Sequence, residues 1–157
     1  MKLAHVVDGP FTGPAVVHDG CAVQLSWLLP DAPGSLDELV RSGRIGEIGD
    51  PGDAAAVDGS PSLADVQLGA PLTEIRNLIC IGRNYKEHVD EEGAERVPEP
   101  PIFSKLPSSV IGPDDVIEWS EALTTDVDWE AELALVIGRD CRDVEAADAL
   151  DVVAAYT

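Results

Sequence analysis

The feature that most constrains the fold of this sequence is the run from Val127 to Ile137, in which apolar side chains recur at every second position. Successive side chains of a β-strand point to opposite faces, so this alternation predicts a strand. On one face the pattern places Glu130 and Glu132 side by side. The opposite face is predicted to be apolar and is formed by Trp129, Ala131, Leu133, Leu135 and Ile137.

The pair formed by Glu130 and Glu132 is a candidate metal site. Two carboxylates at alternate positions of a strand lie about 6.6–7 Å apart along it. They repel each other and lose solvation when the strand is buried, and a divalent cation removes both costs. Ligation by oxygen alone favours Mg²⁺, Mn²⁺ or Ca²⁺ over zinc. The alternative is a solvated face whose carboxylates belong to the general acidic excess of the chain.

That acidic excess is large, because 30 Asp and Glu residues face 10 Lys and Arg residues and give a net charge of −20. Such a charge argues against a nucleic-acid partner and against attraction to an anionic membrane. The acids are dispersed among apolar residues, and lysine is scarce, which predicts a folded protein adapted to high salt. An acidic protein without that adaptation is the alternative.

Cysteine usage and the N-terminus predict a cytoplasmic location. Three widely separated cysteines fit neither a disulfide framework nor a zinc motif, and they suit a reducing compartment. No signal peptide and no apolar run of membrane-spanning length is present in the sequence. We therefore expect neither a membrane partner nor a membrane anchor.

The sequence divides at about residue 70 into two predicted parts. Residues 1–70 are expected to form a small β/α module, with a hairpin at Asp19-Gly20. Ser35-Leu-Asp-Glu38 is a capping box that predicts the start of a helix, and Gly43 is placed to end it. Residues 71–157 are expected to form a separate core of strands and helices. In that part the patterns predict strands at Asn77–Ile81, Ile102–Leu106 and Val116–Trp119, and helices at Asn84–Gly93 and Val144–Ala155.

A second group of candidate residues lies in the predicted helix that follows Asn84. His88 and Glu91 are three residues apart, and this spacing places them on one helix face. A carboxylate that orients an imidazole is a common arrangement for a general base. The alternative is an ordinary contact on a solvated helix. Lys105, at the end of an apolar strand, could meet an anionic substrate or a neighbouring acid.

Four motifs occur in a characteristic order, and together they resemble the fumarylacetoacetate hydrolase family over about residues 74–157. After a strand comes Gly-Arg-Asn-Tyr-x-x-His-x-x-Glu, which ends at Glu91. Pro-x-x-Phe-Ser-Lys-x-Pro-Ser, containing Lys105, and then Ile-Gly-Pro follow it. The last motif, Asp-Trp-Glu-x-Glu-Leu-Ala-Leu-Val-Ile-Gly-Arg, starts at Asp128. The resemblance implies an α+β, mostly β fold: a mixed β-roll core with flanking helices, preceded by a small N-terminal module and assembled as a homodimer.

The resemblance also implies roles for single residues. Glu130 and Glu132 match the metal-binding glutamates of the family, which usually hold Mg²⁺ or Mn²⁺. His88 and Glu91 match a catalytic dyad on a mobile lid helix. The residues expected to contact the substrate are Arg83, Tyr85 and Lys105.

One departure from the family pattern concerns a third metal ligand. In the family an aspartate follows the Tyr-Thr of this region, whereas the present sequence ends at Tyr156-Thr157. We therefore expect the chain to correspond to the N-terminal portion of a member, with a catalytic core that is incomplete at its C-terminus.

The function implied by the resemblance is cleavage of a C–C bond in a 2-oxo acid of the acylpyruvate or fumarylpyruvate type, through a metal-bound enolate. One alternative is isomerisation or decarboxylation of unsaturated 2-oxo diacids in aromatic-compound catabolism. A non-catalytic truncated fragment is the other.

Overall fold

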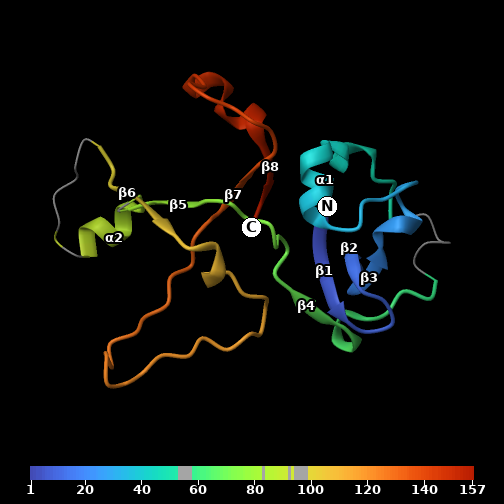
Figure 1. Ribbon diagram of the computed structural model, residues 1–157, viewed down its shortest axis with the longest axis horizontal. Helices are drawn as coiled ribbons and strands as arrows, with labels where there is room; N and C mark the ends of the chain where they lie inside the picture. The colour runs from blue at the N-terminus through green and yellow to red at the C-terminus, as the bar shows by residue number, and fades with distance from the viewer. Residues whose placement is uncertain (53–57, 83, 92, 94–98) are drawn as a thin grey trace. The chain divides into compact units, whose positions relative to one another are not determined.

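The computed structural model of the protein describes residues 1–52, 58–82, 84–91, 93 and 99–157. It is an α+β structure with mostly strands and few helices, which confirms the predicted fold class (Figure 1). Contacts group the chain into two units, one formed by Met1–Leu72 with Gly112–Thr157 and the other by Thr73–Ile111.

In the described residues of the first part of the chain there are four strands, one α-helix and three short 3-10 helices. In chain order they are β1 (Lys2–Asp8), β2 (Gly13–His18), β3 (Cys21–Gln24), η1 (Leu25–Trp27), α1 (Leu36–Ser42), η2 (Arg44–Glu47), η3 (Leu63–Asp65) and β4 (Gln67–Gly69).

The remaining elements are shorter and more widely spaced along the chain. They are β5 (Leu78–Ile81), α2 (Lys86–Glu91), β6 (Ile102–Lys105), η4 (Pro107–Ser109), β7 (Leu135–Ile137), η5 (Ala146–Val152) and β8 (Val153–Tyr156). None of the helices in the described ranges is long and apolar enough to cross a membrane.

The N-terminal strands form one antiparallel sheet in the order β3-β2-β1-β4. The turn between β2 and β3 has positive φ angles at Asp19 (47°) and Gly20 (76°). Two successive left-handed residues are what a tight hairpin needs to match the twist of its strands. The predicted Asp-Gly hairpin is therefore confirmed.

The two faces of this sheet are covered by different parts of the chain. Register pairs Leu3 with Val16 on one face and Ala4 with Ala15 on the other. Each face contributes to a separate buried cluster. The larger cluster consists of Val16, Val23, Leu25, Leu28, Leu29, Leu36, Leu39 and Ile48. On the opposite face Val6, Ala15 and Ala22 are buried beneath Phe11, Leu63, Val66 and Leu68.

Helix α1 begins and ends as its sequence predicts. The Ser35 hydroxyl accepts a hydrogen bond from the backbone N–H of Glu38 at 3.1 Å. The Glu38 carboxylate accepts one from the N–H of Gly34 at 3.1 Å, so both capping side chains satisfy donors at the helix start. Gly43 ends the helix with a left-handed φ of 68°.

The prediction of a strand at Val127–Ile137 is mostly wrong, because only Leu135–Ile137 (β7) is a strand. β7 pairs with β8, and the pairing ends where Ala134 and Thr157 exchange backbone hydrogen bonds. The antiparallel pairing with β8 and Thr157 involves only the last part of this run, from Ala134 to Ile137. The apolar residues of this run are largely exposed, with 82% of Trp129 accessible to solvent.

Two further predictions in the second half are wrong. Residues 116–119 form no strand and belong to a long segment without regular structure, drawn in orange between η4 and β7 (Figure 1). The predicted helix Val144–Ala155 is a 3-10 helix, η5, followed by β8. Pairing of β8 with β7 overrides the helical spacing of its apolar residues, because tertiary context outweighs local pattern.

The described residues of the unit Thr73–Ile111 form an antiparallel pair, β5 and β6, together with α2 and η4. The predicted strands and helix of this region are confirmed with slightly shorter bounds. The N–H of Gly82 donates to the carbonyl oxygen of Pro101 at 2.8 Å, which continues the pairing beyond β5.

Candidate functional site

Helix α2 carries both residues of the predicted catalytic dyad. It follows β5 and contains His88 and Glu91, three positions apart as expected. Val89 between them is 2% exposed and anchors the helix, whereas Glu91 is exposed. An imidazole and a carboxylate at this spacing could act as a general base with its orienting group. The catalytic role of the pair stays a prediction.

The predicted substrate-binding residues belong to the same unit as α2. Tyr85 immediately precedes the helix, is 44% exposed, and its carbonyl oxygen accepts the N–H of Val89 at 3.2 Å. Lys105 is the last residue of β6, opposite Leu78, and is exposed. A cationic side chain and a phenol are suited to binding a carboxylate substrate. Arg83 lies outside the residues that the structure describes.

The predicted metal ligands lie in the other unit. Glu130 and Glu132 are exposed residues of the irregular segment before β7. The backbone near them is held locally, because the N–H of Trp129 donates to the Asp128 carboxylate at 2.8 Å. The predicted residues therefore belong to two different units, α2 with Lys105 to one and the two glutamates to the other.

The two glutamates match the chemistry of a divalent cation but do not make a complete site. Carboxylate oxygens are the ligands that Mg²⁺ and Mn²⁺ prefer, and Glu130 and Glu132 could supply two of them. Mg²⁺ needs about six ligands, some of them water. Within the described ranges, no group of three or more His, Cys, Asp or Glu side chains could hold a metal ion. The donor set is thus a partial one.

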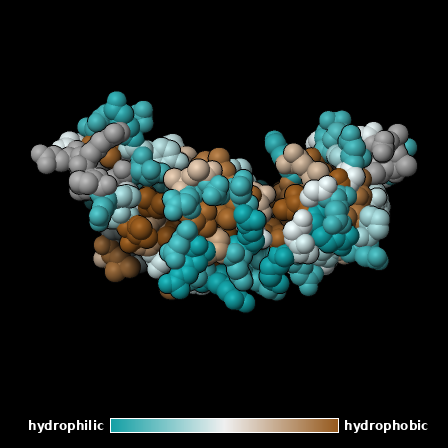
Figure 2. All heavy atoms as spheres, turned by 90° about the horizontal axis from the view of Figure 1, so that it is seen from above, coloured by the Kyte–Doolittle hydropathy of each residue, from teal (hydrophilic) through white to brown (hydrophobic). Residues whose placement is uncertain are grey.

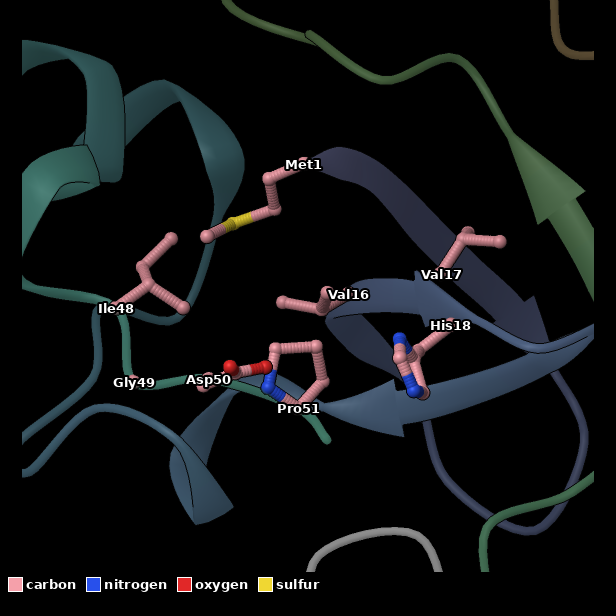
Figure 3. Close-up of a pocket in the computed structure, with 8 residues that line it drawn as sticks. All are labelled: Met1, Val16, Val17, His18, Ile48, Gly49, Asp50 and Pro51. Atoms are coloured by element: carbon pink, nitrogen blue, oxygen red, sulfur yellow. The ribbon is translucent and has the colours of Figure 1, made fainter. Parts of the chain in front are cut away.

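A cavity of about 410 Å³ lies in the N-terminal part of the chain, away in sequence from all of these residues (Figure 3). Its polar groups already have partners nearby. Nε2 of His18 lies 3.4 Å from the Asp19 carboxylate, and the Asp50 carboxylate accepts the N–H of Gly52 at 2.8 Å. No predicted site residue lines it. The lining residues are Met1, Val16, Val17, His18, Ile48, Gly49, Asp50 and Pro51.

Comparison with curated proteins identifies relatives with a named activity. The chain is 44% identical over 96 residues to the mitochondrial oxaloacetate tautomerase fahd2 of Xenopus laevis, which covers 61% of this chain and 30% of that protein. It is 42% identical over 99 residues to the oxaloacetate tautomerase YisK of Bacillus subtilis, with 61% of this chain and 33% of that protein covered. The chain therefore spans about a third of the length of these two relatives.

Solved structures and a family model agree with these relatives. A fumarylacetoacetate hydrolase from Exiguobacterium antarcticum superposes with a TM-score of 0.75 at 32% identity, covering 99% of this chain and 53% of that one. Residues 77–157 match the model described as the C-terminal domain of fumarylacetoacetate (FAA) hydrolase. That match covers more than half of the sequence and contains every predicted site residue. The chain therefore belongs to the fumarylacetoacetate hydrolase family.

Proposed function

We propose that this chain carries part of the active site of an enzyme that interconverts the keto and enol forms of a small 2-oxo diacid such as oxaloacetate. The observation that carries the proposal is the 44% and 42% identity to two oxaloacetate tautomerases. The proposal is close to the isomerase alternative indicated by the sequence, because both reactions move a proton next to a 2-oxo group.

The reaction requires the transfer of one proton and the binding of a dicarboxylate substrate. His88 takes a proton from the methylene carbon of the keto form, and the protonated imidazole gives it back to the 2-oxo oxygen, which forms the enol and returns His88 to its neutral state. Glu91, one helical turn away, orients the imidazole and favours its protonated form. Tyr85 and Lys105 bind a substrate carboxylate, the lysine by charge and the phenol by hydrogen bonding.

Glu130 and Glu132 are proposed as two ligands of a Mg²⁺ or Mn²⁺ ion. When bound, the ion stabilises negative charge that develops on the 2-oxo oxygen. The two exposed carboxylates are the support for this step, since they lie at alternate positions of a segment in the family-matched region. The remaining ligands of the ion are proposed to come from other groups and from water.

A second candidate is hydrolysis of a C–C bond in an acylpyruvate-type substrate. It is favoured by the likeness to the Exiguobacterium antarcticum fumarylacetoacetate hydrolase, which extends over 99% of the chain. In this reaction His88 takes a proton from water, and the resulting hydroxide attacks the distal acyl carbonyl. The bond to the 2-oxo fragment breaks, and its electron pair leaves with that fragment as an enolate. The protonated His88 returns its proton to the enolate, which gives pyruvate or a related 2-oxo acid together with a carboxylic acid.

Loss of the enol absorbance of oxaloacetate, measured with the 157-residue chain and Mn²⁺, tests the first proposal. We expect the chain to raise the rate of absorbance loss above the rate in buffer with Mn²⁺ alone. His88→Asn should lower this rate enhancement by about 10²–10⁴-fold. Glu87→Gln, an exposed carboxylate in the same helix, serves as the matched control and should retain the rate.

Pyruvate release from acetylpyruvate separates the two candidates. Turnover of acetylpyruvate without any effect on oxaloacetate would replace the first proposal with the second. If neither substrate reacts with the Mn²⁺-loaded chain, both proposals fail for this chain.

A further inference from the structure

Apolar side chains are distributed very unevenly along the chain. Among the residues that the structure describes, twelve of the fourteen buried apolar ones lie within positions 4–48, and only Val89 and Val152 lie beyond them. Conversely, most of the large apolar residues that are exposed lie between Ile79 and Tyr156. Brown apolar areas accordingly appear at the surface beside hydrophilic ones (Figure 2). The family-matched region thus leaves uncovered the kind of surface that normally forms a core.

The pair β5–β6 shows this most clearly. Its register places Ile81 opposite Ile102 and Ile79 opposite Ser104, so these four residues share one face. The three isoleucines are 67% (Ile79), 50% (Ile81) and 70% (Ile102) exposed. This face is therefore apolar and uncovered by the described residues. A sheet of two strands with an open apolar face is at best marginally stable in water.

The pair β7–β8 repeats the arrangement in the other unit. Leu135 lies opposite Tyr156, and Ile137 follows Leu135 two residues along the same strand. The three side chains are 49%, 56% and 52% exposed, in the order Leu135, Tyr156 and Ile137. β7 and β8 pair only with each other among the described strands, so each has an outer edge available to a further strand.

We propose that the apolar faces of β5–β6 and β7–β8 are contact surfaces for a polypeptide equivalent to the part of the solved relative that this chain does not match. The chain covers 53% of the Exiguobacterium antarcticum protein at a TM-score of 0.75, so almost half of that fold is built from other residues. A polypeptide of that origin supplies both apolar side chains for the two faces and strands for their edges.

A second copy of this chain fits these faces less well than such a polypeptide. Residues 113–157 carry thirteen acidic side chains against two arginines. Two copies that met through β7–β8 would bring these like charges together, which disfavours association. A second copy would also present the same two-stranded sheets and leave its own open edges.

Hydrogen exchange of the 157-residue chain tests the proposal. The probe is a polypeptide that comprises the unmatched part of the Exiguobacterium antarcticum protein. We expect it to slow amide exchange in β5, β6, β7 and β8 by at least about tenfold, while exchange in β1–β3 is unchanged. A single chain in which this polypeptide follows Thr157 provides the same measurement if the separate polypeptide aggregates.

Substitutions at exposed positions identify the surface itself. Ile81→Lys and Leu135→Lys should each abolish the slowing in their own sheet, because a buried, unpaired ammonium group is costly. Val116→Lys, at a residue 78% exposed in the irregular segment, is the matched control and should leave it intact. The proposal is overturned if neither the separate nor the joined polypeptide slows exchange. It is equally overturned if the chain alone forms a dimer that protects the same strands.

Discussion

Gly112 lies so close to Gly69 that a β-carbon on Gly112 would be 2.9 Å from the Cα of Gly69 and 3.0 Å from the carbonyl oxygen of Leu68. The obstructing atoms belong to the backbone at β4, which cannot rotate away as a side chain can. The N–H of Gly112 also donates to the Asp115 carboxylate at 2.7 Å, which holds the residue in place. The Ile-Gly-Pro motif thus has a physical requirement for glycine at its centre.

Gly112→Ala should therefore destabilise the chain. Overpacking against a rigid backbone costs about 1–3 kcal/mol, and we expect a loss of that size in the free energy of unfolding by urea. Gly46→Ala is the matched control, because a β-carbon there meets nothing within 4 Å. The control should be neutral or stabilising by up to about 1 kcal/mol. Equal stabilities of the two variants would show that the close approach to Gly69 does not prevent a β-carbon from being accommodated at position 112.

The cap of α1 provides a second prediction. Ser35→Ala removes the acceptor for the N–H of Glu38 and should lower the free energy of unfolding by about 1 kcal/mol. Ser35→Asn keeps a capping acceptor and should retain most of the stability. The midpoint of urea unfolding, followed by circular dichroism, compares the two. A loss of the same size in both variants would argue against the hydrogen bond as the cause.

The larger N-terminal cluster provides a third prediction. Leu39 is 0% exposed, whereas Leu123 in the irregular segment is 85% exposed. Leu39→Ala should cost about 2–5 kcal/mol because it removes buried contacts and leaves a cavity. Leu123→Ala should change the free energy of unfolding by less than about 0.5 kcal/mol. A small effect at Leu39 would mean that the cluster is not tightly packed in solution.

Salt dependence follows from the net charge of −20. Raising NaCl from about 0.1 M to 1 M shortens the screening length from about 10 Å to 3 Å, which weakens repulsion among the dispersed carboxylates. We expect the midpoint of urea unfolding to rise over this range. KCl at equal concentrations should act in the same way if screening is the cause. A midpoint that stays constant or falls would contradict an adaptation to high salt.

Metal binding to Glu130 and Glu132 can be measured apart from catalysis. We expect the combined change Glu130→Gln and Glu132→Gln to weaken Mn²⁺ binding at least about tenfold in calorimetry, since two anionic ligands are lost. Glu118→Gln with Glu121→Gln makes the same change in charge in the same irregular segment and is the control. If both double variants bound Mn²⁺ equally weakly, the loss of affinity would be due to the lower net charge and not to the loss of two metal ligands.

The N-terminal part of the fold could be predicted well from local signals. Asp19-Gly20 specified its turn through left-handed backbone angles, and the Ser35 cap specified the start of α1. These features depend on residues within a few positions of each other, so the local sequence is sufficient to predict them.

The region after residue 110 could not be predicted equally well, because its strands depend on partners far away in sequence. Alternation from Val127 to Ile137 predicted one long strand, but only the three residues opposite β8 became one. In the same way, Val153 joined a strand despite its helical spacing. In the sequence Gly112 is recognisable only as part of the Ile-Gly-Pro motif, and its contact with Gly69 depends on residues far away along the chain.

For the candidate site, the motif order led to the correct family and placed His88 and Glu91 on a helix. Their chemical roles depend on distances between α2 and residues outside it, which local spacing does not determine. The roles of Lys105, Glu130 and Glu132 stay predictions for the same reason.

The two buried clusters of the N-terminal sheet, whose buried members all lie between Val6 and Ile48, have a consequence for biosynthesis. β1, β2 and β3 are consecutive in the chain and pair with their sequence neighbours, so their contacts close only short loops. Such a segment can acquire its structure on the ribosome while the family-matched region is still being translated. The N-terminal part would then already be folded when the family-matched region leaves the ribosome, still unfolded and with its apolar side chains exposed. Chaperones would therefore bind mainly to the family-matched region.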